Sequence, residues 1–261
     1  MMVSTNVRRV GRYSIQILET LGGLCVLLFR IIRALFPPRY DSRQTWRAFY
    51  KVGVRSYSLV ILTALFTGAI MVIQTGHFVM RWQATSFVGW AAGLAVLSEI
   101  GPVLIGLMFS GRVGANNTAE MGTMVVTEQI DALRSLAIEP IQYLVVPRFL
   151  AMIVMLFLLT ALGDLFALIG GAITAEIMLG ISFDVMLQQV IEGRLMDEYI
   201  VGLIKGSAFG MVIAVVSCYF GLTVRGGATG VGRAVNASVV VSALGIFVFD
   251  FVIGVVWAVY L

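Results

Sequence analysis

The chain has 261 residues, of which 59% are hydrophobic and only 12% are charged. A soluble domain carries about 25% charged residues, so this composition excludes an ordinary water-soluble fold. The net charge of +4 does not indicate nucleic-acid binding, because the basic residues flank apolar runs instead of forming a stripe with interleaved aromatic residues. Residues 56–80 and 206–224 contain no aspartate, glutamate, lysine or arginine. Since roughly 20 apolar residues cross a bilayer, the sequence predicts an all-α integral membrane protein with several spans.

The first 56 residues are expected to form an N-terminal interfacial helix and a basic connector. Residues 6–36 have a helical pattern, but Arg30 and Arg33 interrupt its apolar part. An amphipathic helix in the headgroup plane therefore fits better than a span. The same two arginines stand where a signal peptide has its small-residue cleavage site, so this segment is expected to be retained. Three more arginines lie near its start: Arg8, Arg9 and Arg12.

Residues 57–261 are predicted to form a membrane domain with five transmembrane helices, at about 57–80, 87–111, 145–178, 200–222 and 236–261. With the N-terminus in the cytoplasm, fifteen of the eighteen basic residues lie on the cytoplasmic side and only Arg81 and Arg194 lie opposite. This imbalance follows the positive-inside rule and places the C-terminus outside. Between spans three and four, apolar residues at helical spacing predict a short amphipathic outer helix with Ser182 as its N-cap.

A polar helix at about 117–136, on the cytoplasmic side, is the first candidate functional element. It combines an apolar surface with hydrogen-bond acceptors, so it could lie between the membrane domain and a soluble partner. A solvated loop helix is the alternative on composition alone. The candidate acceptors are Glu120, Thr127, Glu128 and Asp131.

Charged residues inside the predicted spans are the second candidate feature. A charge at mid-bilayer costs at least roughly 2.5–3.5 kcal/mol, so each is expected to face protein or water and to have a partner. Lys205 is the one basic residue deep in a span, and it either pairs with Glu99 or Asp250 or meets a lipid phosphate. A buried structural pair that never touches cargo is the alternative. Two further acids lie in spans, Asp164 and Glu176, and the second is expected to be hydrated near the outer end.

Small residues mark positions where helices approach closely. Gly202, Gly206 and Gly210 recur every four residues, which predicts a helix-packing face on span four. Residues 227–234 superficially resemble a phosphate-binding loop, but Arg233 and Ala234 replace its lysine and hydroxyl residue, so a flexible cytoplasmic turn is predicted. Both cysteines, Cys25 and Cys218, lie in apolar runs and are expected to be packing residues; with a single histidine, no metal site is expected.

The run from Glu99 to Arg148 resembles the signature of MlaE/YrbE-type permeases, the membrane subunits of ABC transporters that work with MCE-domain proteins. The resemblance covers about 200 residues in order. It departs from the family pattern at Ser98, where a basic residue is common, and at Val125, where a lysine is common. The run ends with Pro140–Arg148, and further matching blocks are Gly163-Asp164-Leu165, Gly170-Gly171, Gly202–Lys205, Phe209-Gly210, Gly226–Gly232 and Asp250.

The resemblance implies a homodimer of permeases bound to two cytoplasmic ABC ATPase subunits, which would bind the ATP and Mg. It also implies a periplasmic MCE-domain hexamer, a small STAS-domain accessory protein, a location in the cell inner membrane, and phospholipid moving between inner and outer membranes. By the same resemblance the 120–133 segment is the coupling helix to the ATPase. The chain itself is then a transport subunit with no catalytic residue, metal or cofactor.

Two other classes of function remain open at this point. An autonomous secondary transporter would use Glu99, Lys205 and Asp250 as an ion pathway, although no inverted repeat is visible in the sequence. An intramembrane lipid enzyme would need a nucleophile or metal cluster, and no Gly-x-Ser-x-Gly pattern is present.

Overall fold

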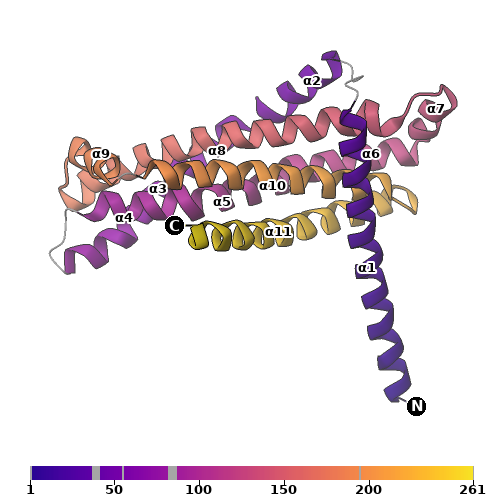
Figure 1. Cartoon of the computed structure of the whole chain (residues 1–261), viewed down its shortest axis with the longest axis horizontal. Helices are drawn as coiled ribbons and strands as arrows, with labels where there is room; N and C mark the ends of the chain where they lie inside the picture. Colours follow the sequence, from indigo (N-terminus) through magenta and orange to yellow (C-terminus); the bar gives the residue numbers. More distant parts are fainter. Residues whose placement is uncertain (1, 37–41, 55, 82–86, 194, 261) are drawn as a thin grey trace.

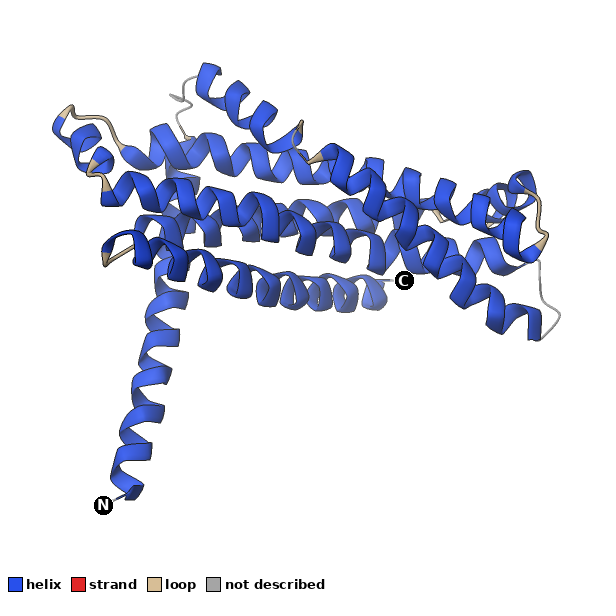
Figure 2. Ribbon diagram, turned by 180° about the vertical axis from the view of Figure 1, so that it is seen from behind, coloured by secondary structure: helices blue, strands red, loops and turns tan. Residues whose placement is uncertain are grey.

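The computed structural model describes residues 2–36, 42–54, 56–81, 87–193 and 195–260. Every regular element in these ranges is helical, which confirms the predicted all-α class. Long helices run side by side as a bundle, and one helix crosses its end (Figures 1 and 2). Five described stretches are long and apolar enough to cross a membrane: Arg43–His77, Val88–Val126, Ile141–Leu179, Met196–Leu222 and Gly227–Val259.

The chain order of the elements follows the predicted spans with additional short pieces. The elements are α1 (Met2–Leu35), α2 (Ser42–Gly53), α3 (Tyr57–Arg81), α4 (Val88–Ala95), η2 (Val96–Ile100), α5 (Gly101–Phe109), η3 (Ser110–Gly114), α6 (Ala115–Val126), α7 (Gln129–Ser135), η4 (Ile141–Val145), α8 (Val146–Thr174), η5 (Ala175–Leu179), α9 (Phe183–Glu192), α10 (Met196–Leu222) and α11 (Gly227–Tyr260). The η elements are single π-helical turns within or beside longer helices.

The centre of the bundle is formed by α8 and α10. Helix α8 packs against α3 on one side and α10 on the other, while α11 packs against α10 and α6. The α3–α8 crossing is close because a Cβ atom at Gly68 would overlap the backbone of Ala167, and one at Gly170 would overlap that of Leu65. Glycine at these positions lets the two backbones touch.

Helix α1 runs across the bundle axis and extends away from it (Figures 1 and 2). Its C-terminal half is anchored by Leu27 and Ile31, which are buried against the core, whereas Leu18 and Phe29 are exposed. Cys25 is also exposed, so the prediction that both cysteines are packing residues is wrong for Cys25; Cys218 is buried. The side chains of Arg8, Arg9 and Arg12 lie outside the described side chains, and the in-plane orientation of α1 stays a prediction.

The second span is longer than predicted. The helix that begins at Val88 continues to Val126 instead of ending near 111, a run of 39 residues. Pro102 has no N–H to donate, and the π turn before it lets the Gly101 N–H donate to the Val96 carbonyl. The helix therefore continues through Gly101-Pro102 without a break, and it is roughly 58 Å long at about 1.5 Å per residue.

Two predictions about the ends of helices need correction. Residues 227–234 are not a flexible turn, because α11 begins at Gly227 and the connection is confined to 223–226. Gly226 (φ 90°) and Gly227 (φ 68°) adopt the left-handed backbone that reverses the chain there. The short helix α9 is confirmed, but the Ser182 side chain makes no capping hydrogen bond; its backbone carbonyl instead accepts from the Met186 N–H.

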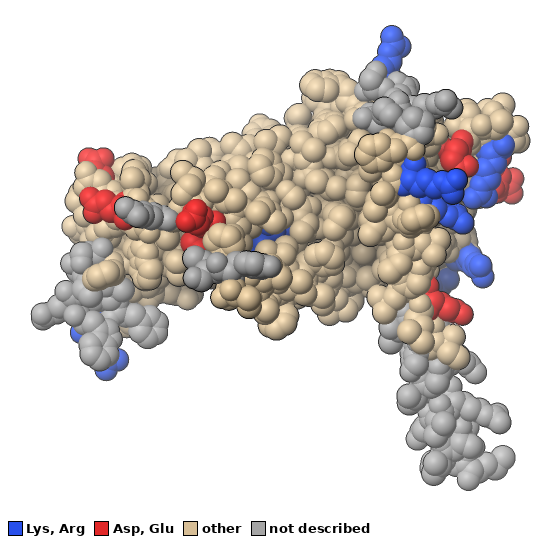
Figure 3. Space-filling model, viewed as in Figure 1, with Lys and Arg blue, Asp and Glu red and all other residues tan. Residues whose placement is uncertain are grey.

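The charged side chains lie mainly at the two ends of the bundle. On the face drawn in Figure 3, blue side chains gather at the end that carries α7, and most of the surface between the ends is uncharged. Exposed apolar side chains cover this middle zone, among them Phe66, Leu165 and Phe251. This distribution is typical of a protein that crosses a bilayer.

Candidate functional site

An ion-pair cluster inside the bundle joins three separate elements. The Lys205 Nζ atom on α10 lies 2.7 Å from Glu99 Oε1 on η2 and 2.9 Å from Asp250 Oδ1 on α11. The structure therefore brings together all three intramembrane residues singled out from the sequence, and Lys205 pairs with both acids instead of one. Two carboxylates around one ammonium leave a formal charge of −1 if all three are ionised.

The three side chains of the cluster differ in exposure. The side chain of Lys205 is 1% exposed and that of Asp250 is 19% exposed, whereas that of Glu99 is 52% exposed. Gly254 on α11 borders the cluster, since a Cβ atom there would lie 3.8 Å from Glu99 Oε1 and 4.0 Å from Lys205 Nζ. No sequence pattern singles out Gly254, because its role appears only when α11 packs beside the lysine. A polar ligand would reach Lys205 from the Glu99 side.

Asp164 differs from these paired residues. It is fully buried on α8, and neither carboxyl oxygen has a hydrogen-bond partner among the described residues. The expectation that each intramembrane charge has a partner is therefore not met for Asp164. The Asp164 carboxyl group fits because Gly101 has no side chain; a Cβ atom at Gly101 would lie 2.5 Å from Asp164 Oδ1. Glu176, by contrast, is exposed on η5.

The three glycines of span four lie where α10 meets its neighbours. A Cβ atom at Gly202 would overlap the Leu97 carbonyl of η2. At Gly206 it would lie 2.5 Å from Thr160 Oγ1 on α8, and at Gly210 it would lie 2.7 Å from the Met152 carbonyl oxygen on α8. Close approach of α10 to these elements holds Lys205, which lies between the first two glycines, deep in the bundle.

The predicted cytoplasmic helix at 117–136 is two helices in the structure. Helix α6 ends at Val126, and α7 begins at Gln129 after Glu128 adopts a left-handed conformation with φ 59°. Glutamate rarely adopts this conformation, so the sequence offered no signal for the break. Glu128 and Asp131 are exposed, and Asp131 forms an ion pair of 3.0 Å with Arg134. The Thr127 hydroxyl donates to the Thr123 carbonyl.

Glu120 has a different environment from the other three acceptors. Its carboxylate pairs with Lys51 on α2 and lies 3.1 Å from Arg148 on α8. These ion pairs connect α6 to two other helices and engage Glu120 within the chain, whereas Thr127, Glu128 and Asp131 remain at the surface. No sequence spacing indicates this contact, because Lys51 and Glu120 are 69 positions apart.

The arrangement defines a multi-span helical membrane protein with a buried charge cluster and a polar helical end. Residues 45–256 match the family model described as "Permease MlaE", and the chain belongs to this permease family. It is 34% identical over 244 residues to a "probable ABC transporter permease protein" of Rickettsia typhi, covering 94% of each chain. A protein of the same description from Synechocystis sp. is 34% identical over 244 residues, covering 93% of each.

A plant relative extends the comparison. The chloroplastic protein TRIGALACTOSYLDIACYLGLYCEROL 1 of Arabidopsis thaliana is 31% identical over 228 residues, which cover 87% of this chain and 65% of that protein. These relatives and the five candidate spans identify the chain as a transport permease subunit of a multi-pass membrane type.

Proposed function

We propose that this chain moves phospholipid as the permease subunit of an ABC transporter that works with an MCE-domain hexamer between inner and outer membranes. The permease family and the ABC transporter names of its relatives support this assignment. The transporter contains two copies of the chain, two separate ATPase subunits that bind ATP and Mg, and a STAS-domain accessory protein. It resides in the inner membrane, with the N-terminus cytoplasmic and the C-terminus periplasmic.

The chemistry of the cargo explains why a permease needs both apolar surface and a buried cation. A two-chain lipid has about thirty methylenes, and exposing them to water at roughly 0.8 kcal/mol each would cost on the order of 25 kcal/mol. The acyl chains therefore follow the apolar faces of the spans. The phosphate needs a cation at the same depth, and Lys205 is the one described lysine or arginine that is buried within the bundle.

The observation that carries the proposal is the uneven exposure of the Lys205 cluster, in which Glu99 is exposed and Lys205 is buried. Its two carboxylates compensate the buried ammonium while the site is empty. Because Glu99 is half-exposed, a phosphate approaching from that side can replace the Glu99 carboxylate as the partner of Lys205. The lysine then stays paired in both states, so neither state leaves an uncompensated cation in the membrane.

The movement driven by ATP is transmitted to the Lys205 cluster through the cytoplasmic helices α6 and α7. ATP-driven closure of the ATPase subunits pushes the exposed α6–α7 junction, where Thr127, Glu128 and Asp131 contact the ATPase. Glu120 passes this displacement to α2 and α8 through its ion pairs with Lys51 and Arg148. Since α10 is packed against α8 and α6, the movement changes the position of Lys205 relative to α11.

A lipid-crosslinking and transport assay on Lys205 variants tests the cargo role. In the reconstituted complex, Lys205→Ala is expected to lower crosslinking of a photoactivatable phospholipid and lipid transfer by tenfold or more, while Arg225→Ala, an exposed loop residue, leaves both unchanged. Because Lys205→Ala leaves two acids without their cation, a second variant combines Lys205→Met, Glu99→Gln and Asp250→Asn. Unchanged lipid occupancy and turnover in this charge-balanced variant would remove the cargo role.

A further inference from the structure

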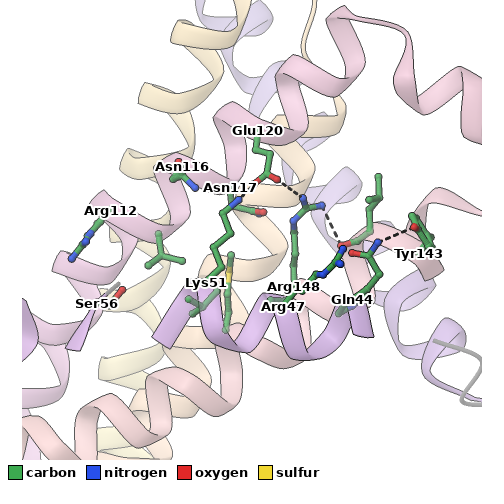
Figure 4. A pocket seen from close by; sticks show the side chains of 16 residues that line it. Gln44, Arg47, Lys51, Ser56, Arg112, Asn116, Asn117, Glu120, Tyr143 and Arg148 are labelled. Atoms are coloured by element: carbon green, nitrogen blue, oxygen red, sulfur yellow. Dashed lines mark hydrogen bonds and ion pairs between the residues drawn. The ribbon is translucent and has the colours of Figure 1, made fainter. Parts of the chain in front are cut away.

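A cavity of about 480 Å³ lies between α2, α6 and α8, away from the Lys205 cluster (Figure 4). Its wall contains four basic side chains and one acidic side chain: Arg47, Lys51, Arg112, Arg148 and Glu120. The formal charge of this set is +3 when all five are ionised. None of these residues belongs to the intramembrane cluster, and the proposed cargo route does not use the cavity, although Glu120, Lys51 and Arg148 also take part in the proposed coupling.

The positive charge of the cavity is only partly compensated. Glu120 pairs with Lys51 and Arg148, and Figure 4 shows both basic side chains directed toward it. Arg47 and Arg112 are exposed and form no hydrogen bond or ion pair with any residue that the structure describes. Arg112 is drawn apart from the Glu120 group, so unpaired positive charge is spread over the cavity. An anion would therefore gain favourable interactions there without displacing an existing partner.

The rest of the wall is mixed: it contains the polar residues Gln44, Ser56, Asn116 and Asn117 and also apolar residues, and the apolar part favours a lipid over a soluble anion. Val52 on α2 and Leu144 and Met152 on the α8 side lie next to the basic groups. On the outer face of α2, Trp46 is 76% exposed and Tyr50 is 64% exposed. Aromatic side chains of this kind concentrate at the level of lipid headgroups. The cavity thus combines an excess of positive charge with some apolar surface, beside aromatic side chains of the kind found at the membrane interface.

We propose that this cavity binds the phosphate headgroup of an anionic phospholipid from the leaflet next to α2. Basic pockets between membrane helices select such headgroups by charge, and the acyl chains continue along apolar helix surface. Glu120 organises the pocket by fixing Lys51 and Arg148, while Arg47 and Arg112 supply the free cations. A bound headgroup joins α2 to α6 and α8, the same helices that Glu120 connects.

Lipid retention measured by native mass spectrometry tests the site. The full chain is placed in nanodiscs of equal phosphatidylglycerol and phosphatidylcholine, and retained lipid is compared between the natural chain and the Arg47→Gln/Arg112→Gln variant. Each basic residue near a membrane surface strengthens anionic-lipid binding about fivefold, so the variant, which lacks two of them, is expected to retain phosphatidylglycerol about 25-fold less well. The control, Arg225→Gln/Arg233→Gln, removes two exposed arginines outside the cavity and is expected to match the natural chain.

A competition experiment distinguishes binding of a lipid headgroup from binding of a soluble phosphate. Glycerol 1-phosphate at millimolar concentration is expected not to displace phosphatidylglycerol, because it lacks the acyl chains; displacement would assign the cavity to a soluble phosphate and overturn the lipid assignment. Equal retention in the double variant and its control would also overturn the proposal. If the double variant is unstable, the single Arg47→Gln and Arg112→Gln variants are compared instead. Unchanged phosphatidylglycerol retention in both single variants would contradict the proposed site. Lys205 is unchanged throughout, so failure here is distinct from failure of the proposed transport function.

Discussion

Glu120 and Glu128 are separated by only eight positions but have different physical surroundings. The Glu120 carboxylate is half-enclosed between Lys51 and Arg148, whereas Glu128 is exposed. Removing one member of a partly buried ion-pair network leaves its partners uncompensated, while an exposed acid contributes little to stability. The two residues therefore affect different properties of the protein.

The Glu120→Gln substitution is expected to lower the free energy of unfolding by about 1–2 kcal/mol, because Lys51 and Arg148 lose their shared carboxylate. Glu128→Gln is the matched control and leaves the thermal midpoint of the isolated chain unchanged. If Glu128 contacts the ATPase, its substitution instead weakens co-purification of that subunit. Thermal unfolding followed by fluorescence-detected size exclusion measures the first effect. Equal midpoints for the two variants would contradict the network described for Glu120.

The environment of Lys205 could be predicted only in part from residue type. A single lysine among apolar residues must be compensated, so its pairing with an acid could be predicted from the sequence. Its simultaneous contact with Glu99 and Asp250 could not, because that depends on how η2 and α11 approach α10. The same reasoning failed for Asp164, whose partner was expected and is absent from the described residues.

At the scale of elements, the position of α10 depends on glycine contacts with α8. A Cβ atom at Gly210 would lie 2.7 Å from the Met152 carbonyl oxygen and 2.9 Å from the Ile153 Cα atom. Both are backbone atoms, so relief requires the helices to move apart. Gly232 on α11 provides the contrasting case, because a Cβ atom there would meet no other atom within 4 Å.

Gly210→Ala is accordingly expected to destabilise the chain by about 1–3 kcal/mol, as overpacking does in other tightly packed cores. Gly232→Ala has the opposite expectation of no loss or a gain of up to about 1 kcal/mol, because alanine favours the helix and meets open space. The free energy of unfolding of both variants, measured in mixed detergent micelles under the same conditions, tests this difference. Tolerance of alanine at both positions would mean that α10 is not held by this contact.

The junction of α6 and α7 illustrates why helix boundaries were harder to predict than spans. Residues 117–136 have uninterrupted helical composition, and Glu128 gives no turn signal. The break arises from its positive φ angle, which local sequence preference does not favour. In the opposite direction, a glycine followed by a proline commonly ends a helix, but at Gly101-Pro102 the π turn before them keeps the helix continuous.

At the scale of the whole molecule, hydropathy was sufficient to predict the all-α class and the order of five spans. Apolar runs must cross the bilayer, so this prediction needs no knowledge of tertiary contacts. Three features depend on contacts between segments that are distant in the sequence. They are the packing of α1 on η4 and α10, the close crossing of α3 and α8 at glycines, and the basic cavity beside α2. These features therefore appeared only in the structure.

The large apolar surface of α11 is also a property of the whole molecule. In the most apolar 18-residue segment of α11, only 11% is buried within one chain, whereas 67% of the corresponding segment of α10 is buried. The proposed transporter uses this helix beside the Lys205 cluster, where it faces lipid or the second permease copy. If the proposed transporter is correct, we therefore expect activity only in the assembled complex.

ATP-dependent lipid transfer is the decisive test of whether this chain is a lipid conduit driven by a separate ATPase. The complex purified through a tag on this chain is reconstituted in vesicles, and transfer of a labelled phospholipid to the MCE-domain partner is followed with and without ATP. We expect an ATPase to co-purify with the chain and lipid transfer to require both hydrolysable ATP and Lys205. Lipid transfer by the isolated chain in a pH gradient without any ATPase, or a purified complex that contains no ATPase, would contradict it.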